Sequence, residues 1–416
     1  GMVDTLMLSS VNDQAVGAVG TANTYIGIFI IMFSVISSGM VAVMTQNIGA
    51  GRPGVAYQAR QLGLAFNAVL GVIMSLFLSL GAGTILSGVG VADALMQPAK
   101  TYLQIVGGFC ILNALIPICS SYLRAFGFSK EPLYASIIGN VINFCLNAFF
   151  LFVLHKGVAG VATATVISRI INLVIVVLLG AVLVKAKQHP ERESNRAVMG
   201  QIIRIGLPSA CETAIYNVSM TLVIRFLNQM DAQGLNVTAR SYTMQITNFS
   251  YCVGAALAQA NAIMTGWHIG AKEYDACDRG TKKAAVIGVI VAVILETVFT
   301  LCSGWIMQLF SKDPQMVSLV GKLLAIDIVL EIGRVTNLVY GQALKTSGDA
   351  VFPVVMGACF MILCSVGGTY LFGIRLGLLA VGAYIGMTGD ECVRAVGMYL
   401  RWKSGKWKEK GLVKSR

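Results

Sequence analysis

Long apolar stretches separated by short polar segments dominate the chain. Stretches of about 20–27 residues match the length that crosses a hydrocarbon core of ~30 Å. They predict eleven spanning helices, at 19–45, 62–86, 101–122, 133–154, 158–184, 202–228, 237–266, 284–310, 319–341, 350–373 and 377–402. Residues 1–9, GMVDTLMLS, are interpreted as the end of another helix. We therefore predict an all-α polytopic membrane protein with twelve transmembrane helices, the first one truncated.

Composition supports a membrane protein and excludes an ordinary soluble one. Hydrophobic residues make up 56% of the 416 residues and charged residues only 12%. Soluble domains carry about 25% charged residues. The chain therefore has too few charges to cover a water-facing surface.

The net charge of +12 first suggests a nucleic-acid partner, but the distribution of the charges argues against one. Alternate loops and the tail from Arg401 hold 21 Lys and Arg, and the remaining loops hold four. This asymmetry is the positive-inside rule. It predicts a cytoplasmic C-terminus, the lipid bilayer as surroundings and no nucleic-acid partner.

Two pairs of segments repeat at one offset. IGAGRPG at 48–54 matches IGAKEYD at 269–275, and LRAFGFSKEP at 123–132 matches LKTSGDAVFP at 344–353, both shifted by 221 residues. Each half then holds six helices, which makes parallel repeats related by a pseudo-two-fold axis along the membrane normal. The predicted domains are a first lobe at 1–184, a cytoplasmic linker at 185–201, a second lobe at 202–402 and a basic cytoplasmic tail at 403–416.

Charged residues inside the predicted spans are the candidate functional residues. The span at 319–341 contains Asp327, Glu331 and Arg334. A charge at mid-membrane costs about 2.5–3.5 kcal/mol and usually faces a cavity or a partner. Glu331 and Arg334 lie three residues apart, so they are either a structural ion pair or part of a site. Asp327 has no such neighbour and is the better candidate for a titrating group.

Other polar residues inside the predicted spans have more than one possible role. Asp390 and Arg394 are spaced as a structural pair, and Glu296 has no evident partner. Asn143 and Asn147 share one helix face with Asn140, where amides either hydrogen-bond between helices or line a site.

Metal, redox and enzyme chemistry has little support. The ten cysteines lie almost all inside predicted helices without a CxxC pair, so most are expected to be small buried hydrophobes. The three histidines lack metal-site spacing, and no nucleophile motif occurs. We predict no cofactor and no enzyme activity.

Several motifs in order carry a family resemblance. They are VDTLMLSSVNDQAVGAVGTAN, QNIGAGRPGVAYQA, GVAGVATATVISR, IRIGLPSACE and ALKTSGD. Together they resemble the multidrug and toxic compound extrusion (MATE) family over nearly the whole chain. The resemblance implies two six-helix lobes that exchange inward H⁺ or Na⁺ for outward, often cationic, organic compounds by alternating access. It also implies a monomer in a bacterial inner membrane, with small organic cations as partners.

In the first lobe, the resemblance places Asp4 at the family's first-helix cation site. Asn143 and Thr165 match polar residues of that site in some branches. Asn147 stands where those branches have a second aspartate, which is a departure because an amide does not titrate. Cation coupling is thus expected at Asp4, Asn143, Asn147 and Thr165.

In the second lobe, Glu212 matches the acidic residue of the family's seventh helix. Arg334 falls near the family's tenth-helix aspartate, with Asp327 and Glu331 earlier on the same helix. Coupling is expected at Glu212, Asp327 and Glu331, and Na⁺, if it is the ion, at Asp4 or Glu212. The substrate is expected to contact Asp4, Glu212, Asp327, Glu331 and Arg334.

Three other functions remain as alternatives. A flippase for lipid-linked oligosaccharides shares the duplication but is expected to line its cavity with arginines. A channel needs a continuous polar ring, and an intramembrane enzyme needs a nucleophile with a base.

Overall fold

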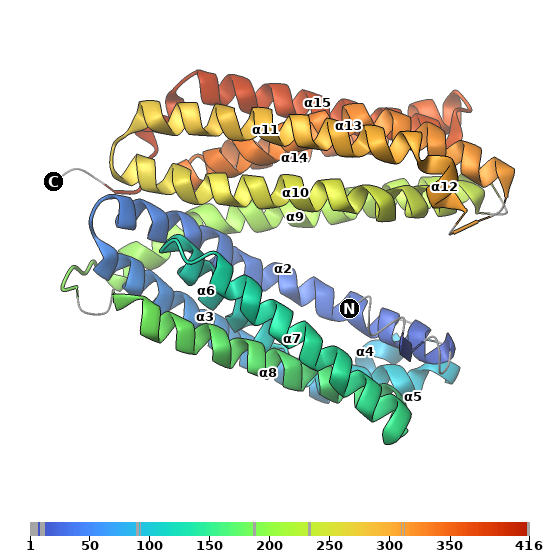
Figure 1. The fold of residues 1–416 in the computed structure, drawn as a ribbon, viewed down its shortest axis with the longest axis horizontal. Helices are drawn as coiled ribbons and strands as arrows, with labels where there is room; N and C mark the ends of the chain where they lie inside the picture. The colour runs from blue at the N-terminus through green and yellow to red at the C-terminus, as the bar shows by residue number, and fades with distance from the viewer. Residues whose placement is uncertain are drawn as a thin grey trace. The chain divides into compact units, whose positions relative to one another are not determined.

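The computed structural model describes most of the chain. The described residues are 7–8, 13–88, 91, 93–185, 189–231, 234–308, 310–311 and 313–413. Within these ranges all regular structure is helical, which confirms the predicted all-α class (Figure 1). Asp4 and most of the predicted first helix lie outside the described residues.

The chain divides into two compact units. The first comprises 1–44 and 52–206, and the second comprises 45–51 and 207–416. Described helices of the first unit are α2 (Asp13–Gly49), α3 (Pro53–Leu80), α4 (Ala82–Gly88), α5 (Asp93–Tyr102), η1 (Leu103–Gly107), α6 (Ile111–Ala125), α7 (Lys130–Ala148), η2 (Phe149–Val153) and α8 (Gly157–Leu183).

The second unit continues from a helix that begins in the first. Its described helices are α9 (Asn195–Met230), α10 (Leu235–Gly270), α11 (Tyr274–Leu301), α12 (Ser303–Met307), α13 (Pro314–Ser347), α14 (Val351–Phe360), η4 (Met361–Val366), η5 (Thr369–Arg375), α15 (Leu379–Lys403) and η6 (Lys406–Glu409). Here α13 contacts α10, α11 and α15, so it forms the centre of this unit.

Backbone geometry repeats at the offset found in the sequence. The helix pairs α3 and α11, α5 and α13, and α7 and α14 each begin 221 residues apart. Gly51 and Lys272, at the same offset, have φ of 71° and 61°, and Gly127 and Gly348 have φ of 89° and 99°. Left-handed residues at matching positions after matching helices support an internal duplication.

Some helix ends differ from the hydropathy prediction. The helices predicted at 62–86 and 284–310 run at Pro53–Leu80 and Tyr274–Leu301, so their starts were placed nine and ten residues too late and their ends six and nine. Proline is favoured in the first turn, and Pro53 begins α3. Hydropathy marks only the part of a helix that lies in lipid, whereas the polar first turns of α3 and α11 are also helical.

Six described helices are long and apolar enough to cross a membrane, or seven if the pair bent by 42° at 95–107 and 111–125 is one span. The central helix α13 is not among the six. It carries four charged residues between 322 and 334, including Asp327 and Arg334, and three of these four are largely shielded within the unit.

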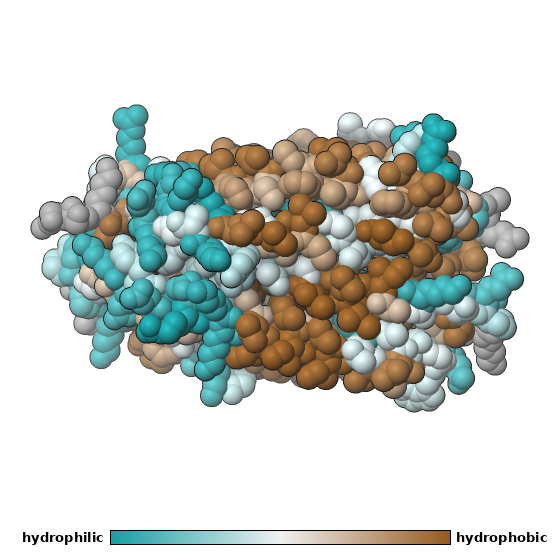
Figure 2. Space-filling view, turned by 90° about the horizontal axis from the view of Figure 1, so that it is seen from above, coloured by the Kyte–Doolittle hydropathy of each residue, from teal (hydrophilic) through white to brown (hydrophobic). Residues whose placement is uncertain are grey.

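The outer surface of the helices is apolar. On the face that Figure 2 shows, hydrophobic side chains gather over the middle of the helices and hydrophilic ones near their ends. All ten cysteines are free, and only Cys110, Cys119 and Cys277 are buried. The expectation that most cysteines are buried was wrong: five are exposed and two are half-buried, because a thiol behaves as a small hydrophobe and is tolerated on an apolar helix surface.

Residues after α15 fold back against the second unit. The rings of Trp402 and Trp407 stack with centroids 4.1 Å apart, and Trp407 is buried. Gln46, at the end of α2 that belongs to the second unit, binds this segment. Its Oε1 accepts from the Leu412 amide at 2.7 Å, and its Nε2 donates to the Thr346 carbonyl at 2.6 Å. This part of the basic tail is therefore packed rather than fully solvated.

The start of α10 is fixed by Asp231, which lies outside the helices. Its carboxylate accepts from the amides of Leu235 at 2.8 Å and Asn236 at 3.0 Å. Partial burial opposes ionisation of Asp231, but these hydrogen bonds outweigh it and lower its pKa. Asn236 in turn accepts from the Ala380 amide at 3.0 Å, which ties α10 to α15.

Close packing of α13 against α15 generates a prediction. A Cβ added at Gly333 would lie 2.9 Å from the backbone nitrogen of Cys392, whereas one added at Gly389 would meet nothing within 4 Å. We expect Gly333→Ala to destabilise the protein by about 1–3 kcal/mol, as overpacking does. Gly389→Ala, on α15, is the matched control and should melt at or above the wild-type temperature, because Ala favours helix. Equal melting temperatures for the two variants in detergent would contradict this packing.

Candidate functional site

The candidate site is built on one face of α13. Asp327, Glu331 and Arg334 lie four and three residues apart, so they follow one stripe of the helix. Asp327 is 2% exposed and Glu331 is fully buried, while the Arg334 side chain is 22% exposed. The three charges noticed in the sequence are thus inside the second unit, not on its lipid-facing surface.

A third buried carboxylate comes from the neighbouring helix α11. Glu296 is fully buried, and the ligand oxygens of Glu296, Asp327 and Glu331 lie within 4.8 Å of one another. Both oxygens of Glu296, Oδ2 of Asp327 and Oε2 of Glu331 have no hydrogen-bond partner among the described residues. We call these three residues the carboxylate cluster.

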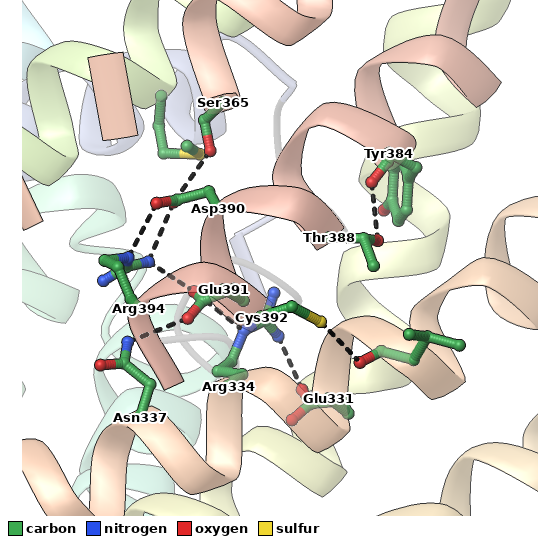
Figure 3. Close-up of polar contacts among 12 residues, drawn as sticks. Glu331, Arg334, Asn337, Ser365, Tyr384, Thr388, Asp390, Glu391, Cys392 and Arg394 are labelled. Atoms are coloured by element: carbon green, nitrogen blue, oxygen red, sulfur yellow. Dashed lines mark hydrogen bonds and ion pairs between the residues drawn. The ribbon is translucent and has the colours of Figure 1, made fainter. Parts of the chain in front are cut away.

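Arg334 connects the carboxylate cluster to α15. Its Nη1 donates to Oε1 of Glu331 at 2.6 Å, and its Nε lies 3.8 Å from Oε1 of Glu391 (Figure 3). The ion pair that the spacing of Glu331 and Arg334 allowed is therefore present. Asp327 forms no ion pair within 4 Å in the described part of the chain.

On α15 lies a second group of charges in which every charged residue has an ion-pair partner. Arg394 binds Asp390 through two hydrogen bonds of 2.8 and 3.0 Å and also lies 2.9 Å from Glu391. Asp390 accepts from Ser365 at 3.0 Å and Glu391 from Asn337 at 3.0 Å (Figure 3). The predicted Asp390–Arg394 pair is present, and we call these five residues the α15 network.

Two adjoining cavities within the second unit reach these charges. The first has an empty volume of about 830 Å³ and is lined by Asp327, Asp390 and Arg240 among others. The second, of about 1030 Å³, is lined by Glu212 and Lys345 among others. Tyr216, Tyr251, Arg334 and Glu391 line both.

Glu212 has an ion-pair partner that was not predicted from the sequence. Lys345, near the end of α13, lies 2.5 Å from Oε2 of Glu212 on α9, and both side chains are 15% exposed. The ALKTSGD motif contains this lysine, but nothing in the spacing links residues 133 positions apart.

The candidates of the first unit make hydrogen bonds within their own helices. Asn147 is fully buried and donates to Oδ1 of Asn143 at 3.3 Å. The Thr165 hydroxyl on α8 donates to the Val161 carbonyl one turn earlier, at 2.9 Å. Asn140 is exposed, so the three asparagines of α7 do not form one buried stripe. Asp4, which the resemblance places here, lies outside the described residues.

Electrostatics decides what the carboxylate cluster can do. Two unit charges 4.8 Å apart repel by about 3 kcal/mol at an effective dielectric constant of ~20. Arg334 neutralises one of the three carboxylates, and it is shared with Glu391. The carboxylate cluster is therefore stable only if it takes up a proton or a small cation, for which its unpartnered oxygens are suitable ligands.

A helical membrane protein with buried, partly uncompensated charges beside internal cavities has the features of a secondary transporter. The MatE family model matches residues 1–149 and 208–371, and the chain belongs to this family. It is a family of transporters, not of enzymes.

Individual relatives agree with this assignment. The uncharacterized transporter YisQ of Bacillus subtilis is 33% identical, with 99% of this chain and 92% of YisQ aligned. The probable multidrug resistance protein NorM of Thermotoga maritima is 22% identical over 99% of this chain and 90% of its own length.

Solved structures show the fold. A multidrug resistance MATE family transporter of the MOP superfamily in an outward-facing conformation superposes with a TM-score of 0.87 at 18% identity, covering 100% of this chain and 92% of that one. A MATE in the bent conformation gives 0.89 at 18% identity, covering 98% and 91%. The predicted family and its two-lobe, twelve-helix fold are confirmed.

The α15 network generates a stability prediction. Arg394→Gln leaves Asp390 and Glu391 without their main counter-charge in a buried place, which typically costs about 3–5 kcal/mol. We expect a large drop in melting temperature in detergent, partly restored by adding Asp390→Asn. Arg375→Gln is the control, since Arg375 is exposed and donates only to the Tyr370 hydroxyl. An Arg394→Gln protein that melts like the Arg375→Gln protein would show that this network stabilises nothing.

Proposed function

We propose that the protein is a secondary active antiporter that exports organic, cationic compounds in exchange for H⁺ or Na⁺. The supporting observation is the carboxylate cluster, in which only Glu331 of the three buried acids is paired with an arginine and all three keep unpartnered oxygens. The coupling cation binds between Glu296, Asp327 and Glu331. The family match supports transport of small organic compounds, because relatives such as NorM bear the name of multidrug resistance proteins.

Asp327 links the coupling cation to the cargo. It belongs to the carboxylate cluster and also lines the first cavity. A cationic group in that cavity and a cation in the cluster therefore compete for the same negative charge. Each lowers the affinity for the other by the same factor, which is the thermodynamic basis of antiport.

The other predicted residues keep supporting roles in this proposal. Arg334 neutralises Glu331, so that a net charge of about two negative units remains to attract a cation when Glu296 and Asp327 are ionised. Glu212 is paired with Lys345 at the second cavity and is released for cargo when that pair separates. Asp4, with Asn143, Asn147 and Thr165, supplies a coupling site in the first lobe, as the resemblance implies.

A flippase for a lipid-linked oligosaccharide is less well supported. Basic side chains do line the two cavities, namely Arg240, Arg334, Arg394 and Lys345. Three of these four are ion-paired with acids of the same unit. A diphosphate group would have to displace those acids, so the cavities fit a cation exchanger better.

Exchange by the carboxylate cluster is tested in proteoliposomes. We expect Asp327→Asn and Glu296→Gln each to reduce ion-driven uptake of a lipophilic cation at least tenfold, since each removes a charge that holds the coupling ion. Asp275→Asn is the matched control, because Asp275 is an exposed acid at the other end of α11. Comparing a pure pH gradient with a pure sodium gradient identifies the ion. Normal transport by both cluster variants would rule out this site.

We also propose a multi-pass protein of the inner membrane, acting as a monomer, with a cytoplasmic C-terminus. The distribution of Lys and Arg supports this orientation. A C-terminal fusion to green fluorescent protein should fluoresce in bacterial cells, and one to alkaline phosphatase should be inactive. An active phosphatase fusion would reverse the orientation.

A further inference from the structure

One buried cation of the second unit differs from the others in having no acidic partner. Arg240 lies near the beginning of α10, is 6% exposed and lines the first cavity. Its Nη2 lies 3.6 Å from the sulfur of Met220, and its Nε has no hydrogen-bond partner in the described residues. No described carboxylate lies within the 4.0 Å that defines an ion pair with it.

This arrangement leaves Nε of Arg240 without a hydrogen bond and the guanidinium without a counter-charge among the described residues. A thioether is a weak acceptor and offers no counter-charge. Buried arginines are usually paired, as Arg334 and Arg394 are in the same unit. The contrast within one set of helices indicates that no described residue of this unit pairs with Arg240, so a molecule bound in the cavity can supply its counter-charge.

The same cavity also contains a buried negative charge with an oxygen that lacks a hydrogen-bond partner. Asp327 also lines it and has an unpartnered Oδ2. The lining also includes three aromatic rings, those of Tyr216, Tyr251 and Tyr384. The cavity thus presents one cation, one anion and aromatic surface to a single occupant.

We propose that Arg240 binds a carboxylate group of an amphoteric cargo whose positive group lies at Asp327. The guanidinium fork matches a carboxylate with two parallel hydrogen bonds. Aromatic rings accept the flat, cationic part of such a molecule. This inference rests on the proposed antiport function and narrows its cargo from simple cations to molecules that also carry an acid.

Two dyes with one ring system test the role of Arg240. Rhodamine 110 has a free carboxylate beside its cationic xanthene, and rhodamine 123 is its methyl ester. Fluorescence polarisation with the purified protein gives the affinity for each. We expect wild type to prefer the acid by about tenfold, because the ester leaves the guanidinium unpaired.

The variants give the decisive comparison. In Arg240→Gln the ratio of the two affinities should fall to near one, and Arg240→Lys should keep part of the preference. Arg375→Gln, an exposed arginine, should keep the full ratio. No preference in wild type, no binding of either dye, or a full preference in Arg240→Gln would overturn the proposal.

Exchange assays separate this proposal from the antiport function. If Asp327→Asn loses ion-driven exchange of both dyes while Arg240→Gln loses only the preference for the acid, both hold. If Asp327→Asn exchanges both dyes normally, the antiport mechanism fails, whatever Arg240 does. If Asp327→Asn fails to exchange but Arg240→Gln keeps its preference, only the role of Arg240 fails.

Discussion

The need to balance buried charge shapes the second unit of this protein. A carboxylate or guanidinium away from water is costly unless it is paired, protonated or bound to an ion. The central helix α13 brings Asp327, Glu331 and Arg334 into the interior, and α11 and α15 add further charges around them. Charged groups that are paired with one another stabilise the fold. Charged groups that lack a full set of partners are available to bind an ion or a cargo molecule.

Two neighbouring sets of charges meet this constraint in different ways. In the α15 network, Arg394 satisfies Asp390 and Glu391, and Ser365 and Asn337 provide the remaining hydrogen bonds. The carboxylate cluster has three acids and a shared arginine. The first set is a complete structural network, whereas the second requires a proton or cation that the chain does not supply. Exchange follows from this missing positive charge, because either the cargo or the coupling ion can supply it.

Sequence patterns predicted the contacts that lie along one helix. The all-α class follows from hydropathy, and the Glu331–Arg334 and Asp390–Arg394 pairs follow from helical spacing. The duplication follows from segments that repeat 221 residues apart. The helix ends were less accurate, because the polar first turns of α3 and α11 extend beyond the lipid-facing part.

Contacts between helices could not be predicted. The approach of Glu296 to Asp327 and the Glu212–Lys345 pair join residues of different helices, and one sequence offers no measure of such distances. The isolation of Arg240 is also a property of three-dimensional surroundings, not of its place in α10. The exposed cysteines show a related limit: hydropathy identifies a spanning helix but does not tell which of its faces meets lipid.

The proposed exchange requires that the coupling cation and the cargo neutralise the same buried acids in turn. The most direct measurement is the affinity of the purified protein for a fluorescent cation, determined while pH and sodium concentration are varied separately. We expect the apparent Kd to rise in proportion to the concentration of one of these two ions, and Asp327→Asn to abolish this dependence. An affinity that is independent of both ions would contradict the proposed exchange.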